Sequence, residues 1–318
     1  MIKIDLITGF LGSGKTTFIR NYVKYLMKQG ENICLLENDY GAVNVDIMLL
    51  SDLMGDQLDM EMVAGGCDWD CHLRRFKSKL ISMGMLGYTR VIVEPSGIYD
   101  PDEFFDALRE EPLDRWYEIG SVLCIADAGL GDGLSGEDRY VLATEAACAG
   151  QLVISKTQLY PPEYVDNLLT LINNSLEEVH CKRRYTKDML FTKAWDLLED
   201  EDYEGFAAAG YCNFSYEKRQ IMEENEYRSL YFMEKGYGKK ELEEKAKAIL
   251  SDPDCGNVIR IKGFFKEGDG WYQLNATRRD FTIDPLGDGQ DIVIVIGRDL
   301  VRDAIASYLG EPADIHVD

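Results

Sequence analysis

The sequence predicts an α/β protein with a mostly parallel sheet covered by helices on both faces, followed by a smaller α+β domain. Three observations indicate this fold class. Short apolar runs alternate with amphipathic stretches up to about residue 190, each run is apolar throughout, and the pattern changes beyond residue 226. Continuously apolar strands between helical segments are typical of a parallel sheet that is buried on both sides.

The first part of the chain supplies the strands of this sheet. The run from Ile2 to Thr8 is the first, and apolar pairs spaced four residues apart between Phe18 and Met27 indicate that a helix follows it. The later runs are short and are separated by stretches that are long enough to hold a crossover helix. These later strands are expected at 33–36, 91–93, 122–126 and 152–154.

A change of composition then indicates a domain boundary. Residues 199–226 are rich in acids, tyrosine and small residues and follow no clean period. Beyond them the pattern predicts a small domain with a mostly antiparallel sheet. The expected strands lie at 227–233, 258–265, 271–275, 281–283 and 292–296, and the expected helices at 239–250 and 300–309. We therefore expect a first domain at 1–200, a linker at 201–225 and a second domain at 226–318.

The charge and the cysteines limit the partners and the compartment. With 57 Asp plus Glu against 34 Lys plus Arg, the formal net charge is −23, which repels nucleic acid and anionic membrane surfaces. No stretch approaches eighteen apolar residues, and the amino terminus lacks the features of a signal peptide. The eight cysteines are dispersed, as reduced thiols are. We expect a cytoplasmic protein without nucleic-acid or membrane partners.

A phosphate-binding loop is the strongest motif. Residues 9–16 read GFLGSGKT and fit the pattern G-x-x-x-x-G-K-[ST], between an apolar strand and an amphipathic helix. In such a loop the backbone N–H groups bind the β- and γ-phosphates, Lys15 adds a positive charge, and the Thr16 hydroxyl ligates Mg²⁺. We expect the nucleotide to be bound here by Gly9, Gly12, Ser13, Gly14, Lys15, Thr16 and Thr17.

An acid at the end of the 91–93 strand is a second candidate. The Glu94 carboxylate is placed to hold a water of Mg²⁺ or to orient the attacking water, and Gly97 offers its N–H to the γ-phosphate. The alternative is a simple surface turn at 94–97, which the presence of the phosphate loop disfavours. Polar residues at 37–41 and Asp46 form another candidate edge. We predict Lys15 and Glu94 as catalytic residues, and Thr16, Asp46 and Glu94 as Mg²⁺ ligands.

These blocks resemble the CobW-type P-loop GTPases, a family that includes zinc and cobalt metallochaperones and is related to nickel-enzyme maturation GTPases. The resemblance implies a nucleotide-binding domain joined to a CobW-type C-terminal domain, GTP and Mg²⁺ as ligands, and a client metalloprotein or corrinoid protein as partner. It extends over almost the whole chain. The matching blocks are 7–17, 37–41, 94–97, 126–128, 260–264 and 296–299.

The base-recognition motif departs from the family pattern. The family has Asn-Lys-x-Asp, whereas residues 155–158 read SKTQ here. Lys156 is still expected to lie along the purine, but Gln158 replaces the carboxylate that accepts two hydrogen bonds from guanine, so the charge-assisted part of guanine selection is lost. The resemblance favours GTP, and ATP or relaxed base specificity remains an alternative.

The metal motif departs as well. The family carries Gly-Cys-x-Cys-Cys, whereas residues 66–72 read GCDWDCH. Cys67, Cys71 and His72 offer a soft site for Zn²⁺ or Co²⁺. The alternative is that Cys67 is a vestige and His72 an ordinary surface residue.

Our leading hypothesis is a Mg²⁺-dependent GTPase that acts as a switch in delivering a metal or corrinoid cofactor to a client protein. Its turnover is expected to be slow without the client. One alternative is a binding module in which nucleotide holds a docking shape without being hydrolysed. Another is a P-loop kinase for a small molecule, which is disfavoured because no lid or acceptor motif is recognisable.

Overall fold

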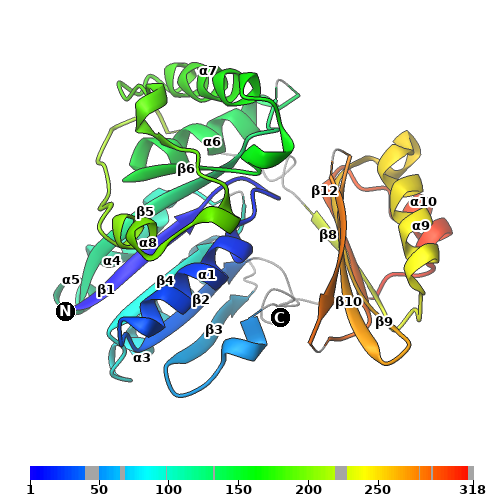
Figure 1. Cartoon of the computed structure of the whole chain (residues 1–318), viewed down its shortest axis with the longest axis horizontal. Helices are drawn as coiled ribbons and strands as arrows, with labels where there is room; N and C mark the ends of the chain where they lie inside the picture. Colours follow the sequence, from blue (N-terminus) through cyan, green and yellow to red (C-terminus); the bar gives the residue numbers. More distant parts are fainter. Residues whose placement is uncertain are drawn as a thin grey trace. The chain divides into compact units, whose positions relative to one another are not determined.

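The computed structural model describes residues 1–39, 50–64, 69–97, 99–131, 133–218, 228–278, 280–287 and 289–313. The chain divides into two compact units (Figure 1). The first contains the described residues among 1–39 and 53–218 and is built on a seven-stranded sheet. The second contains the described residues among 50–52 and 228–313 and is built on a five-stranded sheet.

The seven strands of the first sheet are all parallel. Their order is β3-β2-β4-β1-β5-β6-β7, so the strand that precedes the phosphate loop, β1, lies in the middle of the sheet between β4 and β5. From Ile4 onward this central strand is buried on both faces. Its sequence IKIDLIT is not apolar throughout: Lys3 is exposed, and Asp5 is buried with Arg90 as its cationic partner. The bounds are β1 Ile2–Thr8, β2 Ile33–Asp39, β3 Leu58–Ala64, β4 Arg90–Pro95, β5 Tyr117–Asp127, β6 Gln151–Ser155 and β7 Leu190–Phe191.

Helices cover both faces of this sheet. Ile4 and Leu6 of β1 belong to a core with residues of α3, α4 and α5, whereas Asp5 between them faces α1, where the Tyr22 hydroxyl reaches it. Successive side chains of a strand point to opposite faces, so α1 and α3–α5 lie on opposite sides. The helices are α1 Lys15–Lys28, α3 Trp69–Gly84, α4 Pro101–Leu108, α5 Leu113–Trp116, α6 Gly136–Cys148, α7 Glu163–Glu178 and α8 Asp200–Ala207.

Two strands of the first sheet were missing from the sequence prediction. β3 reads LDMEMVA and lies at the sheet edge, where one side is open to solvent, so it does not form a continuous apolar run. β7 contains two residues, which is too short for any periodicity. The five strands predicted for this half are confirmed as β1, β2, β4, β5 and β6.

The second unit is an antiparallel sheet with two helices. Its strand order is β11-β10-β9-β12-β8, and each neighbouring pair is antiparallel. The core between the sheet and its helices includes Phe232, Leu242, Ile261, Val293 and Ile305. All strands and helices that the sequence predicted for this part are confirmed. Their bounds are β8 Arg228–Met233, α9 Lys239–Ser251, β9 Asn257–Glu267, β10 Gly270–Thr277, β11 Phe281–Leu286, β12 Ile292–Arg298 and α10 Arg302–Leu309.

Together the two units confirm the predicted fold class: a parallel sheet with helices on both faces and a smaller α+β unit. Within the ranges given above, no helix is both long enough and apolar enough to cross a membrane.

The stretch with the changed composition is described up to residue 218, and it packs on the first unit. Phe206 of α8 packs edge-on against Phe18 of α1, with ring centroids 5.2 Å apart, and Tyr211 forms an antiparallel bridge with Ala149. Residues 200–218 are therefore part of the first unit. The functional division into 1–200, 201–225 and 226–318 stays a prediction, and residues 219–227 lie outside the described ranges.

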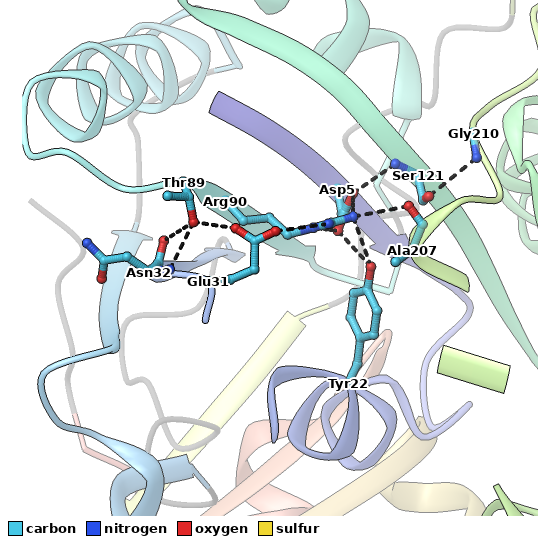
Figure 2. A network of polar contacts seen from close by, with 9 residues as sticks. All are labelled: Asp5, Tyr22, Glu31, Asn32, Thr89, Arg90, Ser121, Ala207 and Gly210. Atoms are coloured by element: carbon cyan, nitrogen blue, oxygen red, sulfur yellow. Dashed lines mark hydrogen bonds and ion pairs between the residues drawn. The ribbon is translucent and has the colours of Figure 1, made fainter. Parts of the chain in front are cut away.

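A buried ion pair between β1 and β4 connects these strands to α1 (Figure 2). Arg90 of β4 donates from Nε to Asp5 Oδ2 at 2.6 Å and from Nη2 to Asp5 Oδ1 at 3.1 Å, and both side chains are almost fully buried. Asp5 also accepts hydrogen bonds from the Tyr22 hydroxyl and the Ser121 backbone N–H, at 3.0 and 2.8 Å. Arg90 Nη2 reaches the Ala207 carbonyl at 3.3 Å. The network thus ties α1, β1, β4, β5 and the end of α8 together.

We predict that Arg90→Met is strongly destabilising. The substitution leaves the Asp5 carboxylate buried without its cation, and breaking a buried pair from one side costs about 3–5 kcal/mol. Urea unfolding should show that loss of unfolding free energy. The matched control is Arg115→Met, which removes an exposed pair with Glu111 and should leave the midpoint almost unchanged. Equal midpoints for the two variants would contradict the prediction.

Candidate nucleotide-binding site

The phosphate loop joins the end of β1 to α1 through three glycines with positive φ. The φ angles of Gly9, Gly12 and Gly14 are 146°, 80° and 95°, a region that residues with a Cβ rarely adopt. Space is restricted as well, because a Cβ on Gly9 would lie 2.2 Å from the Ile125 carbonyl oxygen. The backbone path, and not only phosphate contact, therefore requires glycine at these positions.

Lys15 lies folded over the loop. Its Nζ donates to the Gly9 carbonyl at 2.7 Å, and the residue is 9% exposed. Ser13 is buried, and its backbone N–H bonds the Phe10 carbonyl at 3.0 Å, which closes the turn. Thr17 is exposed on the first turn of α1. The loop thus holds a cation close to backbone N–H groups at a helix amino terminus, an arrangement that binds anions.

Thr16 and Glu94 meet beside the loop. The Thr16 hydroxyl donates to Glu94 Oε1 at 2.8 Å, and Glu94 is 7% exposed at the end of β4. Gly97 lies against the loop too, because a Cβ there would be 2.7 Å from the Leu11 backbone nitrogen. Hydroxyl and carboxylate oxygens are ligands that Mg²⁺ prefers, so the residues present fit that ion.

The predicted base-binding residues follow β5 and β6. Lys156 Nζ pairs with Asp127 Oδ2 at 2.8 Å, and Asp127 Oδ1 accepts from the Gly129 backbone N–H at 2.7 Å. The Thr157 hydroxyl donates to the Thr192 carbonyl at 3.1 Å, which links this turn to the segment after β7. Gln158 is exposed. The Lys156 side chain is thus held in place by a carboxylate that the sequence analysis had not assigned a role.

Trp195 is a further side chain at the loop. A Cβ on Gly14 would lie 2.8 Å from the Trp195 ring, and this ring packs edge-on against Phe18 with centroids 5.9 Å apart. Trp195 stands in no recognisable motif and lies far from the loop in the sequence. Sequence reasoning had no pattern by which to find it.

Glu145 of α6 supports the loop from inside the unit. Its Oε1 accepts from the Thr8 hydroxyl at 2.7 Å and from the Gly9 backbone N–H at 3.1 Å, and the residue is fully buried. Burial raises the pKa of this carboxyl to about 7, although the Lys15 ammonium and the two hydrogen bonds oppose the shift. Sequence analysis missed Glu145 because it lies in a helix without a motif. The sequence feature that could have indicated a buried acid is its position among alanines in the helix 136–148.

The predicted metal residues are described in part. Asp46 and Cys67 lie outside the described residues. His72 is fully buried in α3, with Nε2 2.7 Å from Asn38 Oδ1, so it is not the surface residue of the alternative interpretation. Cys71 is half-buried and is not part of a disulfide. Among the residues that the structure describes, no group of three or more His, Cys, Asp and Glu side chains is arranged to hold a metal ion.

The residues of the phosphate and base regions share one edge of the sheet. Lys15 follows β1, Glu94 ends β4, Asp127 ends β5, and Lys156 follows β6. These are the carboxyl ends of parallel strands, where open α/β sheets bind ligands. From β1 the chain continues to β2 and β3 on one side of the sheet, and later to β5, β6 and β7 on the other side. The arrangement can bind a polyphosphate at β1, a divalent cation at β1 and β4, and a planar base near β6.

Comparisons with known proteins show which family and which proteins the chain is similar to. A model of the CobW/HypB/UreG nucleotide-binding domain matches residues 3–184. The zinc chaperone YeiR of Escherichia coli is 29% identical over 164 residues, which are 51% of this chain and 49% of YeiR, so the match spans about half of that relative. The zinc-regulated GTPase metalloprotein activator 1 of Schizosaccharomyces pombe is 21% identical over 350 residues, covering 95% of this chain and 83% of the activator. The crystal structure of the Zn(II)-bound YjiA GTPase from E. coli is 17% identical, covers 96% of this chain and 97% of its own, and has a TM-score of 0.37.

Proposed function

The chain belongs to the CobW/HypB/UreG nucleotide-binding domain family, and from this premise we propose that it is a Mg²⁺-dependent GTP-binding and GTP-hydrolysing switch that assists metal delivery to a client protein. The observation that carries the proposal is the hydrogen bond between Thr16 and Glu94, 2.8 Å long, beside a glycine loop that holds Lys15. A hydroxyl and a carboxylate from separate elements meet where a cation on the phosphates would lie.

Each loop residue has a role in this proposal. The N–H groups from Gly12 to Thr17 and the Lys15 ammonium bind the phosphates, and Gly97 donates its N–H to the terminal phosphate. Thr16 and Glu94 would hold Mg²⁺, with Asp46 as a further predicted ligand, and Glu94 orients the attacking water. The ion, when bound, supplies positive charge that stabilises the phosphoryl oxygens. Lys15 and Glu94 are the proposed catalytic residues.

GTP is the proposed nucleotide because the family and the relatives' names favour it. Lys156, held by Asp127, would lie along the base, and the exposed Gln158 would meet its edge. A neutral amide provides no bidentate anion for guanine, so ATP binding with relaxed specificity is the alternative.

The proposed cargo is zinc rather than the corrinoid that the resemblance left open. Two relatives are named as a zinc chaperone and a zinc-regulated metalloprotein activator. Cys67 and Cys71 would bind the metal as thiolates, with His72 as a predicted third ligand, and Co²⁺ suits the same donors. The partner would be a client metalloprotein. The described cysteines are in no disulfide with one another, which supports a reducing, cytoplasmic setting.

In the proposed switch, the terminal phosphate orders the polar residues at the carboxyl ends of β2 and β4, and its loss on hydrolysis releases them. A non-hydrolysing binding module is the second candidate, because the base and cysteine motifs both depart from the family pattern. The two differ in whether bound GTP is cleaved.

The proposed activity predicts distinct effects at Lys15 and Glu94. Lys15→Ala should abolish nucleotide binding because the phosphates lose their cation. Glu94→Gln should keep binding but slow phosphate release by roughly 100-fold, the lower range for losing a proton-transfer or water-orienting group. Phosphate release and nucleotide affinity should be measured with GTP and ATP. Lys187→Ala, which removes an exposed lysine paired with Asp166, is the matched control.

Three results would contradict the proposal. GTP binding without phosphate release, with or without a client, would favour the binding module. Transfer of the terminal phosphate to a small acceptor would favour a kinase. No binding of either nucleotide with Mg²⁺ present would remove the nucleotide function.

Base selection gives a separate prediction. Gln158→Asp should raise the preference for GTP over ATP roughly tenfold or more, since hydrogen bonds to a charged group contribute about 1.5–3 kcal/mol. Dissociation constants for both nucleotides should be compared with those of Gln158→Asn, which shortens the side chain and stays neutral. An unchanged GTP-to-ATP ratio would mean that Gln158 does not contact the base.

Zinc binding by the cysteine segment is testable with thiol variants. Zn²⁺ titrated into the reduced protein against a chromophoric chelator should bind at least tenfold more tightly than to the Cys67→Ala, Cys71→Ala variant, because thiolates are the strongest ligands available. Cys212→Ala, which removes a half-buried thiol outside this segment, is the control. Equal affinity in all three proteins would exclude this segment as the metal site.

A further inference from the structure

We propose that Glu145 is a positioning residue of the phosphate loop and that its carboxylate takes up a proton from solvent when a nucleoside triphosphate binds. The inference rests on the proposed function in that it requires nucleotide binding; it adds a residue and a proton linkage to the site. Glu145 contacts no reacting atom and acts through the backbone of Gly9.

The geometry makes Gly9 the point of contact. Glu145 Oε1 accepts from the Gly9 backbone N–H at 3.1 Å, and Lys15 Nζ donates to the Gly9 carbonyl at 2.7 Å. Glu145 also accepts from the Thr8 hydroxyl at 2.7 Å, so the end of β1 and the first loop residue share one acceptor. Two polar groups on opposite sides of one residue therefore fix the start of the loop.

The second oxygen of Glu145 is in an unusual environment. Oε2 is buried and has no hydrogen-bond partner in the described residues, and Glu145 as a whole has no solvent exposure. An ionised oxygen in such a place is costly because neither water nor a donor solvates it. The positive charge that opposes the resulting rise in the pKa of Glu145 is the Lys15 ammonium.

Nucleotide binding changes this balance. The phosphates add negative charge at the loop and engage Lys15, so an ionised Glu145 loses much of its compensation and gains a like charge nearby. Because burial already raises the pKa of Glu145 to about 7, a further rise converts the ionised fraction to the neutral acid near neutral pH. A neutral carboxyl still accepts the hydrogen bonds from Thr8 and Gly9 through Oε1, so the loop stays positioned.

The other charged or titratable groups around Glu145 do not supply this proton linkage. Burial raises the pKa values of Cys124 on β5 and Cys148 on α6 well above the ordinary thiol value, so both stay neutral. Asp100, before α4, is an acid whose pKa burial also raises, and its negative charge favours the neutral form of Glu145. Arg183 donates hydrogen bonds to the carbonyls at the end of α6.

The sign of the pH dependence follows from the uptake of a proton. Nucleotide affinity should be highest below the pKa of Glu145 and should fall as the pH rises through 7 to 8.5, by up to about tenfold per pH unit. The phosphates of the nucleotide titrate in a neighbouring pH range and add a pH dependence of their own to the affinity. Glu145→Gln removes the contribution of Glu145 to the pH dependence, because an amide accepts the same two hydrogen bonds and does not titrate.

The test is calorimetry of GTP with saturating Mg²⁺, at pH 7.5 in HEPES and in Tris, together with dissociation constants from pH 6.5 to 8.5. The protein should take up a measurable fraction of a proton more than Glu145→Gln and should lose roughly tenfold more affinity between the two pH limits. Glu145→Leu should bind weakly at every pH, because the Thr8 and Gly9 donors lose their acceptor. A merely structural Glu145 would give Glu145→Gln the same proton uptake and pH profile as the unaltered protein.

Equal proton uptake and parallel pH profiles for the protein and Glu145→Gln would overturn the inference and leave the proposed function standing. No GTP or ATP binding at any pH would overturn the proposed function, and this inference with it. If Glu145→Gln does not fold, the test is the infrared difference spectrum of the unaltered protein with and without GTP. A gain of the neutral-carboxyl band on GTP binding supports the inference, and no gain overturns it.

Discussion

The backbone turn at Gly9 is the constraint on which the phosphate site depends. The chain leaves the central strand β1 and passes so close to β5 that a Cβ on Gly9 would lie 2.2 Å from the Ile125 carbonyl oxygen. Its N–H is held by Glu145 and its carbonyl by Lys15. Both polar groups of this residue are thus bonded inside the protein, and the loop that follows leads to the amino terminus of α1, where an anion is favoured.

The parallel sheet brings the remaining groups to the same edge. Thr16 and Glu94 meet because β1 and β4 are neighbours, and Lys156 meets Asp127 because β5 and β6 are neighbours. The Asp5–Arg90 pair, further back along β1 and β4, joins these strands to α1 and to the end of α8 (Figure 2). The helix that starts at the phosphate loop is therefore anchored at a second point, about two turns further on, through the Tyr22 hydroxyl.

Strands were predicted correctly from the sequence where their apolar residues matched their burial in the sheet. β1 lies in the middle of the sheet, and its apolar residues Ile4, Leu6 and Ile7 indicated the strand although Lys3 and Asp5 interrupt them. β3 lies at an edge of the sheet, has Asp59 and Glu61 between its apolar residues, and was missed. The stretch from residue 199 to 226 indicated a domain boundary because its composition changes and it follows no clean period. In the structure its residues Tyr203 and Phe206 pack on Tyr25 and Phe18 of α1, a contact between residues that are distant in sequence and that no local pattern indicates.

By itself the sequence determined the phosphate loop, since G-x-x-x-x-G-K-T combines positive φ, N–H groups and a cation within eight residues, and all of these are local properties. It also determined the division into a parallel and an antiparallel sheet through the spacing of apolar runs. Tertiary structure alone decided that Glu145, 136 residues from Gly9, supports the loop, and that Trp195 packs against Gly14. Such contacts arise from how helices pack on strands, and no short-range pattern in the chain specifies which distant side chain will fill a given space.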